Sequence, residues 1–208
     1  VDFAGNLVAN EVLPRRPGAL SSAGMLDAIE SLLTRVCDKA GIHRSALSGV
    51  GIGLPGFIDN AEGLVLWSST LTERGVGLVD MAQRRLQLPV FIDNDANLVA
   101  MAELWFGAGR SLADFAVVTF EHGVGMGFVM NHKLYRGARR LGMELGHTKV
   151  QLDGALCRCG QRGCLEAYVA DYALAREAST ALNWGDREGQ PISVLLESLY
   201  EQAKSGDV

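Results

Sequence analysis

The sequence predicts an α/β protein, and three observations support this fold class. Segments with helical spacing of apolar residues alternate with short apolar runs that are typical of buried strands. Strands that alternate with helices along a chain favour a largely parallel sheet covered by helices. The composition is that of a folded protein, because 48% of the 208 residues are hydrophobic and 21% are charged.

The first half of the chain is predicted to hold three helices and several strands. Residues 1–8 are expected to form strand, turn and strand. Ser21 and Ser22 can cap a helix that Gly41 ends. Short apolar runs predict buried strands at residues 47–54, 64–67 and 89–92, and Pro55-Gly56 predicts a turn after the first of them. Helical spacing predicts two further helices, at residues 78–86 and 96–106.

Gly107 to Gly109 mark a boundary between two predicted domains, residues 1–109 and 110–208. Beyond it, strands are predicted at residues 115–120, 124–130 and 147–152, with a hairpin turn at 131–133. Helices are predicted at about 164–177 and at 193–204, with a polar linker at 183–190 between them.

Charge and hydropathy exclude several classes of partner. The formal net charge of −5 predicts no general attraction to nucleic acid or to anionic membranes. No apolar run approaches the roughly 20 residues that a membrane span needs, and the first residues lack the pattern of a signal peptide. Four cysteines are too few for a disulfide scaffold at this length. We therefore expect a cytoplasmic protein with no membrane partner.

Three of the four cysteines lie within residues 157–164 (CRCGQRGC). Zinc prefers four soft or borderline ligands in a tetrahedron. The predicted structural zinc site has the ligands His147, Cys157, Cys159 and Cys164. Gly160 and Gly163 permit the backbone angles that would bring the last cysteine back to the others. The alternative is a group of buried or reactive thiols beside an unrelated histidine.

An acidic turn, residues 93–97 (DNDAN), follows an apolar strand and opens a helix. Ligands of α/β folds gather at the carboxyl ends of strands. Carboxylates there can accept hydrogen bonds from sugar or alcohol hydroxyls, and one could act as a general base. The alternative is a helix N-cap with no further function.

Glycines also punctuate the predicted turn between two later strands, at Gly123, Gly125 and Gly127. Their backbone N–H groups could approach a phosphate. The alternative is a tight hairpin, because the segment lacks the Lys-Ser/Thr and the following helix of a P-loop.

Together these motifs resemble the ROK family (repressors, open reading frames and sugar kinases). The most specific part is residues 144–147 (ELGH) followed by 157–166 (CRCGQRGCLE), and residues 51–59 (GIGLPGFID) and 92–97 (IDNDAN) match in the family's order. The resemblance extends to about Glu177. It implies an actin-like sugar kinase/Hsp70 fold with two lobes, a sugar site in the cleft and a homodimer. Residues 1–109 would be an N-terminal lobe without its first phosphate-loop strand, and residues 110–208 the first part of the C-terminal lobe.

The resemblance also implies roles for individual residues. The side chains expected to touch sugar hydroxyls are Asn94, Asp95, Glu144, His147 and Glu166, with Thr70 as a looser match. Asp95 occupies the general-base position of the kinases. His147 would contact both zinc and sugar, because a metal-bound imidazole keeps its second nitrogen free. ATP and Mg²⁺ are implied only for a kinase.

Glu121-His122 departs from the kinase pattern, because the kinases carry a Gly-Thr pair at this second phosphate loop. A carboxylate would repel ATP phosphates, and a bulky side chain would block backbone approach. An acidic residue followed by histidine looks like the sugar-responsive repressors of the NagC, Mlc and XylR type, which join a winged helix to a ROK body.

We therefore expect the effector-binding body of a transcriptional regulator, which takes a sugar or sugar phosphate and would reach DNA only through a segment outside this chain. The alternative is a glucokinase-like hexose kinase, in which Asp95 would deprotonate the sugar hydroxyl that attacks the γ-phosphate of ATP.

Overall fold

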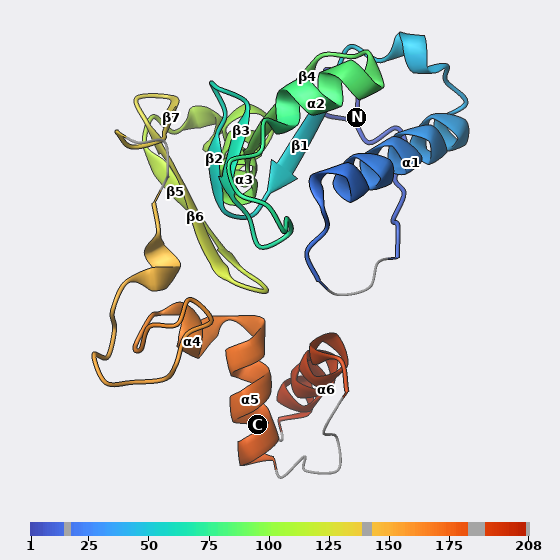
Figure 1. Cartoon of the computed structure of the whole chain (residues 1–208). Helices are drawn as coiled ribbons and strands as arrows, with labels where there is room; N and C mark the ends of the chain where they lie inside the picture. Colours follow the sequence, from blue (N-terminus) through green and yellow to red (C-terminus); the bar gives the residue numbers. More distant parts are fainter. Residues whose placement is uncertain (15–17, 139–142, 183–189, 207–208) are drawn as a thin grey trace. The chain divides into compact units, whose positions relative to one another are not determined.

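The computed structural model in Figure 1 describes residues 1–14, 18–138, 143–182 and 190–206. The chain forms two compact units, one of residues 1–115 with 128–142 and one of residues 116–127 with 143–208. Helices and strands alternate over most of the first unit, so the predicted α/β class is confirmed. Among the described residues, no helix combines the length and apolar character needed to cross a membrane.

The first unit holds three α-helices and the strands around them. Its helices are α1 (Ser22–Ala40), α2 (Leu78–Leu86) and α3 (Asp95–Trp105), with short 3₁₀ turns at Arg44–Ala46 and Ala108–Ser111. Its strands include β1 (Val50–Leu54), β2 (Phe57–Asp59), β3 (Leu64–Trp67) and β4 (Val90–Asn94). The predicted helices and the strands at 47–54, 64–67 and 89–92 are therefore confirmed, with small differences at their ends.

Local signals explain the bounds of α1. The Ser21 hydroxyl accepts a hydrogen bond from the Gly24 N–H at 3.1 Å and caps the first turn. Gly41 ends the helix in the left-handed conformation, with φ of 65° and ψ of 28°. Both predicted boundary residues thus act as the sequence indicates.

The central pair of strands positions the acidic turn. Strands β1 and β4 run parallel, with Val50 opposite Val90 and Leu54 opposite Asn94. Their carboxyl ends therefore meet at one edge of the sheet, where β4 passes directly into α3. Side chains at the start of α3 consequently lie at the strand ends, as ligand-binding side chains of α/β folds do.

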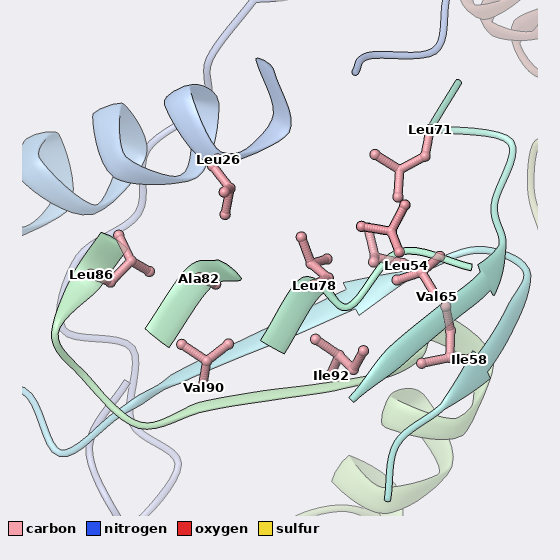
Figure 2. Packing of buried hydrophobic residues seen from close by; sticks show 11 residues of the cluster. Leu26, Leu54, Ile58, Val65, Leu71, Leu78, Ala82, Leu86, Val90 and Ile92 are labelled. Carbon is pink, nitrogen blue, oxygen red and sulfur yellow. The ribbon is translucent and has the colours of Figure 1, made fainter. Parts of the chain in front are cut away.

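A single apolar core holds the first unit together, and Figure 2 shows its packing. Helix α2 contributes Leu78, Ala82 and Leu86, which are spaced by one helical turn, and strand residues pack against them. The buried members are Leu26, Leu54, Ile58, Val65, Leu71, Val76, Leu78, Ala82, Leu86, Val90 and Ile92. Leu78 is fully buried, and burial of one such side chain stabilises the fold by about 1.5–3 kcal/mol.

A three-stranded sheet follows in the order β5 (Phe115–Phe120), β6 (Val124–Met130) and β7 (Lys133–Tyr135). Strands β6 and β7 are antiparallel, with Met130 opposite Lys133. Asn131 and His132 connect them with φ of 52° and 58°. Two left-handed residues of this kind match the twist of a two-residue hairpin, so the predicted turn is confirmed.

The second unit holds a 3₁₀ turn at Leu145–His147 and the helices α4 (Glu166–Val169), α5 (Asp171–Ala181) and α6 (Ile192–Ser205). Helices α5 and α6 pack through Ala175, Ala178 and Leu195. The helix predicted at 193–204 is therefore confirmed. The predicted linker at 183–190 lies outside the described residues except for Gln190.

Two predictions for the second unit are wrong. Residues 147–152 form no strand. Only an isolated bridge joins Lys149 to Cys164, and the alternating Val150 and Leu152 are exposed rather than buried. The helix predicted at 164–177 is divided at Ala170, which is extended with ψ of 159°. The next amide, that of Asp171, donates to the Glu121 carbonyl at 2.9 Å instead of continuing the helix.

The N-terminal prediction is half right. The Asp2 carboxylate accepts the Ala4 and Asn6 amides at 2.9 and 2.8 Å, so a turn forms. No strand is assigned within residues 1–8, which are exposed. Strand β2, in contrast, was not predicted, because Pro55-Gly56 indicates only a turn and the three residues after it carry little pattern.

Candidate metal centre and ligand-binding residues

The second unit gathers the four predicted metal ligands at one point. The donor atoms of His147, Cys157, Cys159 and Cys164 all lie within 4.8 Å of one another. Cys157 and Cys164 are buried and Cys159 is exposed, and no cysteine of the chain forms a disulfide. The alternative of thiols beside an unrelated histidine is disfavoured, because the histidine ring lies within the cluster.

The spacing of these atoms fits a tetrahedral ion. Zinc–sulfur bonds of about 2.3 Å place two thiolates about 3.8 Å apart, and a thiolate and an imidazole nitrogen about 3.6 Å apart. The Sγ atoms of Cys159 and Cys164 are 3.7 Å apart. The Sγ of Cys157 lies 3.7 Å from Nδ1 of His147. The donor set and its geometry therefore fit a zinc ion with Nδ1 as the histidine ligand.

The backbone of the loop explains how three cysteines converge. The Cys157 N–H donates to the Gln161 carbonyl at 2.8 Å, and the Gly160 N–H returns to the Cys157 carbonyl at 2.9 Å. Gly160 and Gly163 have φ of 87° and 75°. At Gly163 a Cβ would collide with the Gln151 carbonyl oxygen, so this position requires glycine.

Burial and hydrogen bonds shift the pKa values of two thiols of the cluster in opposite directions. Burial raises the pKa of the Cys157 thiol to about 12. Burial alone would also raise the pKa of Cys164, but hydrogen bonds from Lys149 and His147 outweigh it and lower the pKa to about 7. A divalent metal ion deprotonates coordinating thiols, so it would stabilise the thiolate that burial disfavours at Cys157.

Three of the predicted sugar-contacting residues lie in this second unit, beside the cluster. Nε2 of His147 lies 4.0 Å from the Glu144 carboxylate. Burial and the nearby Glu166 carboxylate raise the pKa of Glu144, against the opposing effect of His147. The Glu144 carboxylate and Nε2 of His147 are therefore close enough to contact one small ligand.

Glu166 is itself buried and links the cluster to the glycine segment. One carboxylate oxygen accepts from the Cys157 thiol at 3.5 Å, and the other accepts the Val124 N–H at 3.3 Å. A Cβ on Gly123 would lie 2.9 Å from the second oxygen. Gly123 therefore allows this carboxylate to approach the backbone closely.

The predicted phosphate loop is a short turn in front of a strand. Gly123 lies in the turn, whereas Gly125 and Gly127 lie within β6. The Glu121 N–H donates to the Gly123 carbonyl at 3.0 Å. His122 is almost fully exposed, and its Nδ1 lies 3.0 Å from the Asp171 carboxylate.

The acidic turn belongs to the first unit and serves two purposes. Asn94 is the N-cap of α3, because its side chain accepts the Asn97 N–H at 3.2 Å. Its amide also donates to the Gly56 carbonyl at 3.2 Å. Asp95 is exposed, and one of its oxygens accepts the Ala96 N–H at 2.9 Å. The N-cap alternative is therefore realised at Asn94, while the Asp95 carboxylate is accessible to a ligand.

Thr70 lies on a loop of the same unit. Its hydroxyl is 2.8 Å from the hydroxyl of the buried Ser68. Its carbonyl accepts the Leu20 N–H at 2.9 Å, which ties this loop to the segment before α1.

One ion pair beside the acidic turn was not predicted. Arg136, just after β7, donates to an oxygen of the buried Asp93 at 2.7 Å and also contacts the second oxygen. The same carboxylate accepts the Asn94 N–H and the Asn97 side-chain amide. Periodicity carries no signal for such a pair, because the two residues are 43 positions apart.

The fold and these residues define a ROK protein. A model of that family, described as "ROK family", matches residues 1–207, and the chain belongs to it. It accordingly has the actin-like α/β fold of the family's sugar kinases.

Relatives with both kinds of activity are similar to this chain. A xylose repressor of Caldicellulosiruptor bescii is 33% identical over 173 residues, which cover 83% of this chain and 43% of that protein. A glucokinase of Thermotoga maritima is 41% identical over 169 residues, which cover 76% of this chain and 52% of that protein. The chain thus spans about half the length of the curated relatives it matches.

A solved structure of a ROK family protein is also similar to this chain. The ROK family glucokinase from Streptomyces griseus, in complex with glucose and AMPPNP, superposes with a TM-score of 0.78 at 33% identity. The match covers 90% of this chain and 57% of that protein. Both repressors and kinases are therefore homologues of this chain, and the choice between them depends on its own residues.

Proposed function

We propose that this chain is the effector-binding body of a ROK transcriptional regulator that senses a sugar or a sugar phosphate. The predicted sugar-contacting residues are Asn94, Asp95, Glu144, His147 and Glu166, with Thr70 as a further contact. Residues 1–109 and 110–208 would belong to the two lobes of a homodimeric protein. DNA would be bound by a winged helix outside this chain.

The observation that carries this choice is the set of contacts at residues 121–124, where the kinases have their second phosphate loop. The Glu121 carboxylate is exposed and would repel nucleotide phosphates. Two backbone donors that could serve a phosphate are already engaged, the Glu121 N–H by Gly123 and the Val124 N–H by Glu166. This segment is therefore better suited to hold Glu166 in place than to bind a phosphate group.

The alternative is a hexose kinase, and the 41% identical glucokinase favours it. In that reaction Asp95 would accept the proton of a sugar hydroxyl. The hydroxyl oxygen would bond to the γ-phosphorus of ATP as the bond to ADP breaks. Mg²⁺ would accompany the nucleotide. The exposed position of Asp95 at the head of α3 is compatible with this role.

One assay separates the two functions. Purified protein, expressed with the sequence its gene encodes on either side of this chain, is given ATP, Mg²⁺ and a panel of hexoses and amino sugars. A regulator should show a sugar-dependent rise in melting temperature and no ADP release. Sugar-dependent ADP release that Asp95→Asn abolishes would establish the kinase. If the protein shows no sugar-dependent rise in melting temperature and no ADP release, both functions would be contradicted.

For the cysteine cluster, we propose that it holds one structural zinc ion through Nδ1 of His147 and three thiolates. The ion would stiffen the loop that carries His147 and Glu166. Metal analysis should find about one zinc per chain. Cys159→Ser should lower zinc content, stability and sugar response together, whereas Cys37→Ala, in α1, should leave the zinc content unchanged. Full stability in a chain without metal would contradict this role.

A further inference from the structure

The side chain of Lys149, which is not one of the four proposed ligands, reaches the cysteine cluster. Its Nζ lies 3.0 Å from Sγ of Cys164, within hydrogen-bonding distance of a sulfur acceptor. Backbone contacts fix this approach. Lys149 and Cys164 face each other in an antiparallel bridge. On either side of it, the Val150 N–H donates to the Gly163 carbonyl at 2.8 Å and the Leu165 N–H to the Thr148 carbonyl at 2.9 Å.

The contact between Lys149 and Cys164 places a positive charge beside a site whose ligands carry excess negative charge. Three thiolates and a neutral imidazole around a divalent ion carry a net charge of −1. Two carboxylates add to this charge, since Glu166 contacts Cys157 and Glu144 lies near His147. The two arginines of the loop, Arg158 and Arg162, direct their guanidinium groups to the carbonyls of His122 and Gly154 and not to a sulfur. Among the described residues, Lys149 is the only cationic side chain that hydrogen-bonds a ligand sulfur. Its ammonium group therefore offsets a local excess of negative charge.

The contact also supplies a donor to a buried sulfur. Cys164 is fully buried, so water cannot solvate a thiolate there. Lys149 is an exposed residue, yet its Nζ reaches the buried sulfur. Partners outside the first ligand set usually change metal affinity by 10–100-fold when they are lost.

We propose that Lys149 is an outer-sphere residue of the metal centre, which retains the ion by neutralising the site and donating a hydrogen bond to Sγ of Cys164. This inference rests on the zinc site proposed above. The role is specific to a cation with an N–H donor, so arginine should replace lysine in part and an apolar side chain of similar length should not.

The test compares wild-type chain with Lys149→Met, Lys149→Arg and Lys133→Met, the last an exposed lysine in β7. Each protein is loaded with Zn²⁺ alone, and its dissociation constant is measured by competition with a chromogenic chelator. The rate of zinc release and the cobalt–thiolate absorption of a Co²⁺-loaded sample are also recorded. We expect Lys149→Met to bind zinc about 10-fold more weakly and to release it faster. Lys149→Arg should retain most of the affinity, and Lys133→Met all of it.

The outcomes distinguish the two levels of the proposal. A wild-type chain that binds no Zn²⁺ would overturn the metal site itself. A wild-type chain that binds Zn²⁺ while Lys149→Met binds it equally well would overturn only the role of Lys149. Equal weakening in Lys149→Met and Lys149→Arg, with unchanged circular dichroism, would also overturn it, because packing and not charge would then be responsible.

Discussion

The ion pair between Arg136 and Asp93 provides a quantitative test of how the acidic turn is held. Both partners are largely withdrawn from water, with side-chain exposures of 24% for Arg136 and 7% for Asp93. Arg136→Met keeps an unbranched stem of similar length and removes the guanidinium group. The variant therefore leaves the Asp93 carboxylate buried without its cationic partner.

The expected cost follows from the remaining contacts. Removal of one partner of a buried ion pair costs roughly 3–5 kcal/mol. Asp93 would still accept the Asn94 N–H at 2.8 Å and the Asn97 side-chain amide at 3.1 Å. Arg136 is also in part solvated in the wild-type protein. We therefore expect the low end of the range, a loss of about 3 kcal/mol in the free energy of unfolding.

Urea unfolding followed by circular dichroism measures this loss, and Asp93→Asn combined with Arg136→Met is the matched control. An asparagine oxygen can still accept both remaining hydrogen bonds, and no charge is left buried. The double variant should thus be more stable than the single Arg136→Met variant. A loss below about 1 kcal/mol in the single variant, or a double variant that is no more stable, would refute this reasoning.

Two other substitutions test separate parts of the candidate site. A third tests a contact of the first unit, where the Glu73 carboxylate accepts the Ser22 N–H at 3.0 Å at the start of α1. Gly123→Ala would place a methyl group 2.9 Å from the Glu166 carboxylate, so the sugar-induced rise in melting temperature should shrink at constant zinc content. Gly163→Ala should lower zinc content and destabilise the fold by at least about 1–2 kcal/mol, because its φ is 75°. The third substitution is Glu73→Gln. In the wild-type protein, a hydrogen bond from the Thr72 hydroxyl lowers the pKa of the Glu73 carboxyl below its ordinary value of 4.5. The wild-type advantage in urea midpoint should therefore be full above pH 4.5 and disappear as the pH falls through the lowered pKa.

Each of these has an outcome that contradicts it. An unchanged sugar response in Gly123→Ala would show that Glu166 is not held by its contact with the loop. Normal zinc content in Gly163→Ala would show that the loop can close without a left-handed residue. A constant difference between wild type and Glu73→Gln across the acid range would mean that the carboxylate charge contributes no stability.

Local patterns predicted those parts of the fold that local interactions determine. Helix α1 has its cap and its stop within its own sequence, at Ser21 and Gly41. The cysteine cluster likewise lies within a short segment plus one histidine, so its convergence could be expected from spacing. The strand predicted at 147–152 failed because Val150 and Leu152 alternate as in a strand but are exposed. Alternation indicates a strand only where one face is buried.

Contacts between distant segments could not be predicted from the sequence. Arg136 meets Asp93 across 43 residues, and nothing in the neighbourhood of either residue indicates the other. The break at Ala170 has the same cause, since the Glu121 carbonyl that accepts the Asp171 N–H lies 50 positions earlier in the chain. Such pairings depend on tertiary structure, which outweighs local propensity.

The contacts of Glu166 also join distant segments, and they bear on the proposed sensing role. Glu166 contacts Cys157, a proposed metal ligand, with one oxygen and the Val124 N–H with the other. A ligand that donates to the oxygen facing Val124 must therefore compete with, or share, that existing contact of the loop. Sugar binding would then alter the turn at residues 121–123, where a kinase would hold nucleotide phosphates. In the proposed regulator, the contact between Glu166 and Val124 would give this turn a means of transmitting ligand binding.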